Sequence, residues 1–333
     1  MSDPKPVSRR QFLGGSLAAA GAFGLAAGAA AGARPPKAAT ASAAPPPADA
    51  AKLPCGMLGK VKISRMMVGG NLISGYTHSR DLRYVNQLFK AYVTEEKVLE
   101  TLKLAESCGI NTVFETGGNF VERYNREMRG HMQLIPHIEI KPEQSETDLL
   151  THIQKQVDTG AVALYVWGVS GDKMVQAGAV DRIKRAVDLA KAHDMPVGVG
   201  SHSLLVPMAC EKAGVACDFY VKTFHRDDYP SATPKELRKE FIWLDGGKGW
   251  YDNMWCINPE ETAEFMKTVT KPWVAFKILA AGAIAPKAGF AHAFDNGADF
   301  VAVGMFDFQV KEDCEICRDA IARAQKRERP WRA

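Results

Sequence analysis

The chain has 333 residues, of which 46% are hydrophobic, 24% charged and 9% aromatic, and its formal net charge is +4. These ordinary globular values exclude a collagen-like, fully disordered or polytopic membrane chain, and seven cysteines are too few for a disulfide scaffold. Five basic and two acidic residues lie among the first fifty, so residues 51–333 carry only +1. This near-neutral charge gives no reason to expect a nucleic-acid partner.

The first segment has the pattern of an export signal. Arg9 and Arg10 precede a weakly hydrophobic run of Ala, Gly and Leu and a small-x-small motif. This pattern predicts a twin-arginine signal peptide over residues 1–33 that the export machinery recognises and that is then cleaved. The alternative interpretation is a membrane anchor that is retained, which the high content of Gly and Ala disfavours. Residues 34–52 are expected to be an Ala/Pro-rich linker and residues 53–333 the folded domain. The expected location is periplasmic or otherwise extracytoplasmic, without stable membrane insertion after cleavage.

Short β-branched or aromatic runs then alternate with helical patterns. The eight runs are residues 65–71, 111–116, 134–141, 161–167, 196–202, 218–225, 273–279 and 299–306. The alternation predicts a single-domain (β/α)8 TIM barrel of the α/β class, and the continuous apolar character of most runs predicts parallel strands buried on both faces. The first long helix is expected to begin at Thr94 and to end at Cys108-Gly109.

One connection is unusually long. About thirty residues separate the sixth strand from a helix expected near Pro259, and a loop of that length in a compact barrel is usually a lid or binding cap. An insertion or an oligomer contact is the alternative. The loop includes Asp227, Asp228, Tyr229, Trp243, Trp250, Tyr251 and Trp255.

Three segments carry a family resemblance. Residues 109–120 read GINTVFETGGNF, residues 58–65 read LGKVKISR and residues 197–203 read VGVGSHS. They resemble the second strand, the N-terminal hairpin and the fifth strand of the aldo/keto reductase superfamily. The resemblance covers roughly residues 57–225. It implies a TIM barrel and, where the family chemistry is kept, an NADP-dependent oxidoreductase.

The family's catalytic tetrad is altered in this chain. By resemblance, the aspartate, tyrosine, lysine and histidine of the family correspond to Glu115, Phe120, Lys141 and Trp167. Phe120 has no proton to donate, so carbonyl reduction by the family route is not supported. The resemblance therefore implies a related scaffold with a different reaction. NADP is expected only if the protein is a reductase of this kind, and the sequence identifies no other cofactor.

Two lysines in apolar strands indicate another chemistry. Residues 217–223 read CDFYVKT and residues 277–284 read KILAAGAI. They resemble the two lysine-bearing strands of deoxyribose-phosphate aldolases, which implies a Schiff-base lysine whose pKa a second cation lowers. One alternative is that barrel strands of unrelated families have converged on similar sequences. Another is that the two lysines are structural and pair with Glu115 or Asp227.

Reacting groups in a barrel project from the carboxyl ends of the strands. The candidate catalytic residues are Lys277, Lys222, Glu115, Lys141, His202 and His225. The candidate substrate-binding residues are Asn71, Trp167, Asp227, Trp250, Tyr251, Gly282 and Gly304, of which the two glycines lie where barrels commonly bind anions.

No metal site is predicted. Acidic and histidine side chains such as Glu139, His202 and Asp227 offer mixed ligands, but without diagnostic spacing. Cys314 and Cys317 are expected to be a half-buried structural pair on the last helix, because a zinc site needs a second such pair.

These observations lead to an exported barrel enzyme that acts on a small carbonyl or sugar-like substrate by lysine-based lyase, aldolase or isomerase chemistry. An aldo/keto reductase-like NADP-dependent oxidoreductase is one alternative. A non-catalytic carbohydrate-binding barrel is the other.

Overall fold

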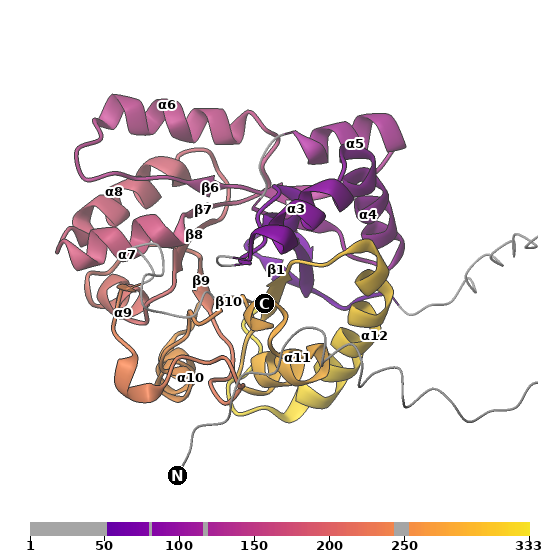
Figure 1. Ribbon diagram of the computed structural model, residues 1–333. Helices are drawn as coiled ribbons and strands as arrows, with labels where there is room; N and C mark the ends of the chain where they lie inside the picture. The colour runs from indigo at the N-terminus through magenta and orange to yellow at the C-terminus, as the bar shows by residue number, and fades with distance from the viewer. Residues whose placement is uncertain (1–51, 80–81, 116–118, 243–252) are drawn as a thin grey trace, which may run out of the picture. The chain divides into compact units, whose positions relative to one another are not determined.

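Eight parallel strands form the predicted barrel in the computed structural model, which describes residues 52–79, 82–115, 119–242 and 253–333; residues 48–333 form one compact unit (Figure 1). All eight predicted strands are confirmed, each somewhat shorter than expected. They are β3 (Met66–Gly69), β4 (Thr112–Phe114), β5 (Gln133–Ile135) continued by β6 (His137–Ile138), β7 (Leu164–Val166), β8 (Val197–Ser201), β9 (Phe219–Thr223), β10 (Trp273–Phe276) and β11 (Phe300–Val303).

Pro136 divides the third barrel strand into β5 and β6. The ladder runs β5-β4-β3-β11-β10-β9-β8-β7-β6, so its two ends belong to the same strand. Proline has no N–H to donate, which interrupts the ladder, yet its carbonyl accepts a hydrogen bond from the backbone of Tyr165 at 3.4 Å. The sheet therefore closes into a barrel.

Helices surround the strands (Figure 1). The first long helix is capped as predicted: the Thr94 side chain accepts a hydrogen bond from the backbone of Lys97 at 3.2 Å, and Gly109 follows the helix at φ +95°. The helices are α2 (Gly70–Ile73), α3 (Arg83–Tyr92), α4 (Glu95–Ser107), α5 (Phe120–Met128), α6 (Glu146–Val157), α7 (Gly168–Gln176), α8 (Val180–Lys191), α9 (Leu205–Lys212), α10 (Pro259–Thr268), α11 (Pro286–Asp295) and α12 (Asp307–Arg323), with short 3-10 turns at Lys235–Leu237, Ala280–Gly282 and Ala324–Lys326.

An antiparallel hairpin of β1 (Cys55–Leu58) and β2 (Val61–Ser64) precedes the barrel, which confirms the predicted N-terminal hairpin. Its Leu58 and Ile63 are buried against Phe300 and other inward-facing strand residues. Because Phe300 begins β11, the hairpin closes the N-terminal end of the barrel. A larger apolar core lies between the strands and the helices.

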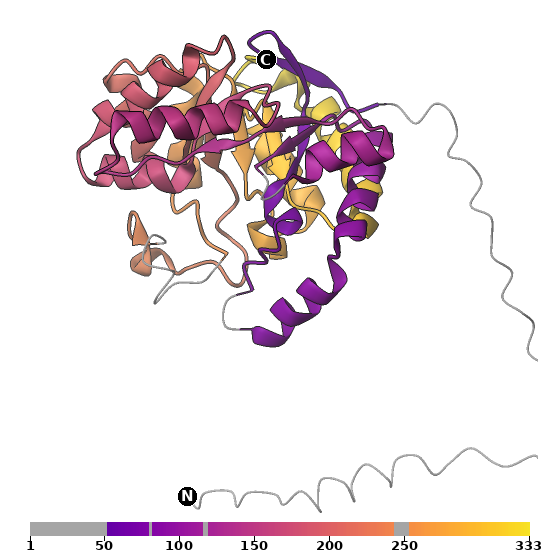
Figure 2. The same ribbon diagram turned by 90° about the horizontal axis from the view of Figure 1, so that it is seen from above.

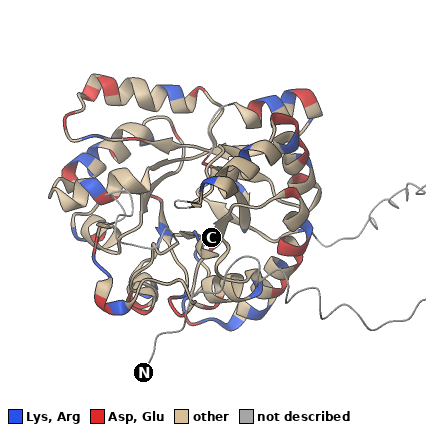
Figure 3. Cartoon of the chain, viewed as in Figure 1, with Lys and Arg blue, Asp and Glu red and all other residues tan. Residues whose placement is uncertain are grey.

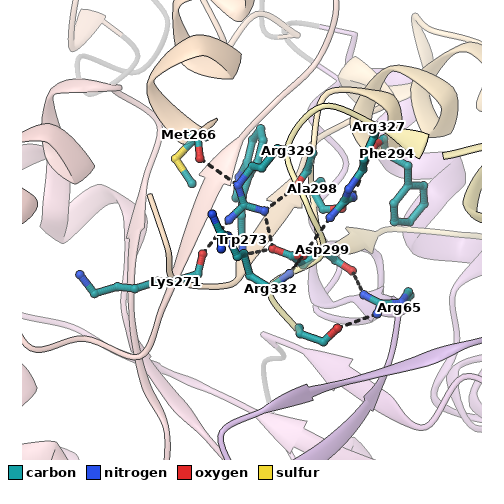
Figure 4. Close-up of polar contacts among 12 residues, drawn as sticks. Arg65, Met266, Lys271, Trp273, Phe294, Ala298, Asp299, Arg327, Arg329 and Arg332 are labelled. Carbon is teal, nitrogen blue, oxygen red and sulfur yellow. Dashed lines mark hydrogen bonds and ion pairs between the residues drawn. The ribbon is translucent and has the colours of Figure 1, made fainter. Parts of the chain in front are cut away.

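A buried ionic cluster anchors the C-terminal tail at the same end (Figure 4). Asp299 is fully buried just before β11, and its carboxylate accepts hydrogen bonds from Arg329 at 2.7 Å, Arg327 at 3.0 Å and the Trp273 backbone at 3.0 Å. Arg65 donates to the Asp299 carbonyl oxygen at 2.9 Å. These contacts join the tail to the starts of three strands, so this face of the barrel is built for stability.

Helix α3 stands away from the other helices (Figure 2) and has two apolar faces. Phe89 is buried, whereas Tyr84 and Leu88 are 88% and 72% exposed.

Elsewhere the surface carries lysine, arginine, aspartate and glutamate interspersed over the helices (Figure 3). Within the described residues, no helix combines the length and the hydropathy that crossing a membrane requires.

The long connection after β9 runs to α10, which begins at Pro259 as predicted. Trp243, Trp250 and Tyr251 in this loop lie outside the described residues, as do the predicted signal and all but the last residue of the predicted linker. Cys314 and Cys317 are both buried on α12, so the pair is more deeply buried than predicted.

Candidate functional site

A cavity of about 820 Å³ opens at the carboxyl ends of the strands. Seven of the eight barrel strands, with the segments that follow them, supply side chains or backbone to its lining. The polar and aromatic groups at those ends include Asn71, Glu115, Tyr165, Trp167, His202 and Lys277. This is the end at which barrel enzymes place their active sites.

Lys277 follows β10 and reaches a histidine across the cavity. Its Nζ lies 2.7 Å from Nε2 of His78, and the Asn71 amide nitrogen lies 3.0 Å from the same Nε2. An amine and an imidazole nitrogen at this distance are hydrogen-bonded, which places the imidazole within reach of a proton on the lysine. The geometry is that of a nucleophile beside its base.

The long loop covers this lysine with an aromatic ring. Nζ of Lys277 lies 4.1 Å from the ring centroid of Trp255. His225 holds the loop there, because its Nε2 accepts hydrogen bonds from the backbone of Trp255 and Cys256, each at 3.0 Å. Burial lowers the pKa of His225 to about 3, which keeps the imidazole neutral and able to accept. His225 is thus a positioning group.

A second imidazole is oriented by a buried carboxylate. Asp172, fully buried on α7, accepts from Nδ1 of His202 at 2.8 Å and from the backbone of His202 and Ser203 at 3.0–3.1 Å. The hydrogen bond favours the tautomer with its proton on Nδ1 and its lone pair on Nε2. Burial lowers the pKa of His202, Asp172 opposes the shift and Lys277 adds to it. A neutral, oriented imidazole in a cavity is suited to general base catalysis.

Glu115 follows β4 and is held by two aromatic neighbours. Its Oε2 accepts a hydrogen bond from the Tyr165 hydroxyl at 2.7 Å, and its Oε1 lies 3.5 Å from Nδ1 of His137. Burial, together with Glu115, raises the pKa of Tyr165 well above its usual value, so the hydroxyl stays protonated and donates. His137 in turn stacks on Trp167 with ring centroids 5.2 Å apart.

The backbone turns both charged residues into the cavity. Phe114 and Phe276 contact the inner core, so strand alternation would place Glu115 and Lys277 on the outside. Both adopt left-handed backbone, with φ of +57° and +58°, and both line the cavity. Such conformations cost about 1–2 kcal/mol for residues with a Cβ and cluster at functional sites.

The cavity thus brings together seven of the predicted site residues: Asn71, Glu115, Trp167, His202, Lys277, Gly282 and Gly304. Four others do not line it: Lys222, Lys141, His225 and Asp227. Trp250 and Tyr251 lie outside the described residues.

Two of the predicted residues that do not line the cavity, Lys222 and Asp227, have hydrogen-bond or ion-pair partners elsewhere in the protein. Val221 faces the inner core, so alternation turns Lys222 outward, where its Nζ donates to the Thr223 carbonyl at 2.8 Å. Asp227 pairs with Arg238 at 2.6 Å within the long loop.

The family tetrad is not assembled among the described residues. The Lys141 side chain is 65% exposed and lies 3.7 Å from Glu139, and Phe120 begins α5; neither lines the cavity with Glu115 and Trp167.

Sequence reasoning missed Asp172, His78, Tyr165 and His137. Asp172 is a single buried carboxylate on α7 and His78 lies on an irregular segment, so neither belongs to a motif with a recognisable spacing. Tyr165 and His137 alternate with apolar residues in strands, and that alternation was the one available signal. In the described part of the chain no cluster of three or more His, Cys, Asp or Glu side chains is placed to hold a metal ion.

No protein-family model matches the chain, and no curated protein matches it. A solved structure described as an aldo-keto reductase from Pseudomonas aeruginosa is similar with a TM-score of 0.53 and 14% identity, over 80% of this chain and 94% of that one. A mandelate oxidase variant with an FMN adduct has a TM-score of 0.47 and 14% identity, over 81% of this chain and 76% of that one. At such identities the similarity to the first shows the fold alone: the chain is a TIM-type (β/α)8 barrel.

Proposed function

We propose that this chain is an enzyme that acts on small carbonyl compounds and uses Lys277 as a Schiff-base nucleophile. The observation that carries the proposal is the pair formed by Nζ of Lys277 and Nε2 of His78, 2.7 Å apart in a cavity at the carboxyl ends of the strands. Lysines with this role need a neighbouring group that leaves the amine neutral. The indole of Trp255 restricts the access of water to the same lysine nitrogen.

The chemistry follows from these positions. The neutral amine of Lys277 attacks the carbonyl carbon while its surplus proton resides on His78, which returns that proton as the carbinolamine loses water to form an iminium ion. His202 then removes a proton. If the proton comes from the carbon beside the iminium, an enamine forms and the enzyme acts as an isomerase. If the proton comes from a hydroxyl on the next carbon, the bond between these two carbons breaks, an aldehyde is released and the enzyme acts as a lyase. Reprotonation of the enamine and hydrolysis restore the lysine.

Borohydride trapping tests the assignment. Sodium borohydride reduces an imine to a stable secondary amine, so an aldehyde substrate leaves its mass on the reacting lysine. We expect peptide mapping to find the adduct on Lys277 in the wild type and in Lys222→Met, and to find none at that position in Lys277→Met. Lys222→Met is the matched control because each variant removes one of the two lysines that the sequence places in apolar strand segments. Equal trapping yields in both variants, or an adduct confined to Lys222, would show that Lys277 is not the nucleophile.

We also propose that the chain is exported through its twin-arginine segment. Replacement of Arg9 and Arg10 by lysine preserves charge and removes the motif that the machinery reads. The variant should accumulate unprocessed inside the cell, as cell fractionation and the mass of the mature chain would show. Identical fractionation of variant and wild type would contradict export by this route.

A further inference from the structure

The cavity has balanced charge, which restricts the ligands it takes. Among the described residues that line it, Glu115 is the one carboxylate, Lys277 the one lysine, and arginine is absent. Because burial lowers the pKa of His202, that imidazole adds no charge at neutral pH. A phosphate or dicarboxylate is bound by an excess of cations or by bidentate arginines, and these residues supply neither.

Several polar side chains of the lining already hydrogen-bond within the protein. Asn71 and Lys277 both contact Nε2 of His78, and Gln309 accepts from the backbone of Phe306 at 3.0 Å. A sugar chain needs a partner for each of its hydroxyls, since a buried hydroxyl without one costs free energy. A lining whose polar groups are engaged in this way is unsuited to a polyhydroxylated ligand.

The remaining walls are flat and aromatic. Phe114 and Tyr165 line the cavity and stack with ring centroids 4.6 Å apart, and Trp167, which stacks on His137 outside the lining, adds a third ring. Trp255 lies over the reacting lysine. Aromatic rings prefer other rings in stacked or edge-to-face contact, and the cavity volume of about 820 Å³ exceeds what a three- or four-carbon metabolite fills.

The entrance continues this apolar character. Helix α3 contributes Val85, which is 49% exposed, and Phe89 to the cavity wall, whereas Tyr84 and Leu88 of the same helix do not line the cavity. An apolar rim beside an apolar cavity favours ligands that leave water readily.

We infer that the cavity takes an uncharged bicyclic or similarly sized aromatic aldehyde or ketone, with its rings against the aromatic wall of Phe114, Tyr165 and Trp167 and its carbonyl carbon at Lys277. Only the position of the carbonyl rests on the proposed function. The aromatic specificity stands on the charge balance, the engaged polar groups and the stacked rings.

Binding and trapping separate the two proposals. Isothermal titration of the full chain with naphthyl methanol, which has rings but no carbonyl, should show saturable binding, whereas D-ribose should show none. Naphthaldehyde with borohydride should label Lys277. If ribose binds and naphthyl methanol does not, the aromatic specificity is overturned. If naphthyl methanol binds and naphthaldehyde gives no adduct at Lys277, the specificity stands and the proposed lysine chemistry fails.

Two variants localise the binding. Trp167→Ala removes part of the aromatic wall and should weaken naphthyl methanol binding about tenfold, as expected for the loss of a stacked ring. Tyr84→Ala removes an exposed aromatic ring of α3 that does not line the cavity, and should leave the affinity unchanged. Circular dichroism confirms that both variants are folded. Equal affinity of Trp167→Ala and wild type would remove this wall from the ligand site.

Discussion

Asparagine in place of Asp299 tests how the N-terminal face holds the barrel together. The carboxylate is fully buried and accepts from Arg329 at 2.7 Å and Arg327 at 3.0 Å. Asparagine keeps the shape but removes the charge and replaces one acceptor with a donor, which leaves the guanidinium groups buried without their counter-charge. Breaking a buried ion pair from one side costs about 3–5 kcal/mol, and we expect a loss of that size in the free energy of unfolding.

Thermal and urea unfolding followed by circular dichroism measure this loss. For a domain of this size 1 kcal/mol shifts the Tm by roughly 2–4 °C, so Asp299→Asn should lower it by about 10 °C. Asp194→Asn is the control: that carboxylate pairs with Lys60, is 92% exposed and should cost less than about 1 kcal/mol. Lysine trapping at Lys277 should persist below the Tm because the cavity lies at the other end of the barrel. A loss no larger than that of the control would refute the reasoning.

Three further predictions concern the site and its support. Lys277→Gly should be about 1 kcal/mol more stable than Lys277→Ala, because glycine adopts φ +58° without a Cβ clash; equal urea midpoints would contradict the strain. Asp172→Asn should lower turnover of a carbonyl substrate about a hundredfold by favouring the wrong tautomer of His202, measured as kcat across the pH range; an unchanged rate would exclude the pair from the mechanism. His225 has a pKa of about 3 when folded and about 6.5 when unfolded, so the unfolded chain binds the proton first, and the stability present above pH 6.5 is lost as the pH falls toward 3, by up to about 4–5 kcal/mol. His225→Gln should flatten that dependence, and parallel urea midpoints for variant and wild type between pH 7 and 4 would count against it.

The fold was predictable because its signals are local. Apolar strand runs, the Thr94 cap and Gly109 after α4 each depend on a few neighbouring residues, and the repeated alternation of strand and helix admits a TIM barrel. Placement of site residues at the strand ends was predictable for the same reason. The interruption of the third strand at Pro136 was not anticipated, although proline is a local signal too.

By itself the amino-acid sequence determined the barrel, its order of strands and the presence of two strand lysines. Only the tertiary structure decided which lysine faces the cavity. Lys222 obeys the period of two and points outward, whereas the left-handed backbone at Lys277 breaks that period and turns the amine inward. The partner of Lys277 is His78, 199 positions away, and the partner of His202 is Asp172, 30 positions away. Such pairs arise from closure of the barrel, which brings distant strand ends together and which no local pattern encodes.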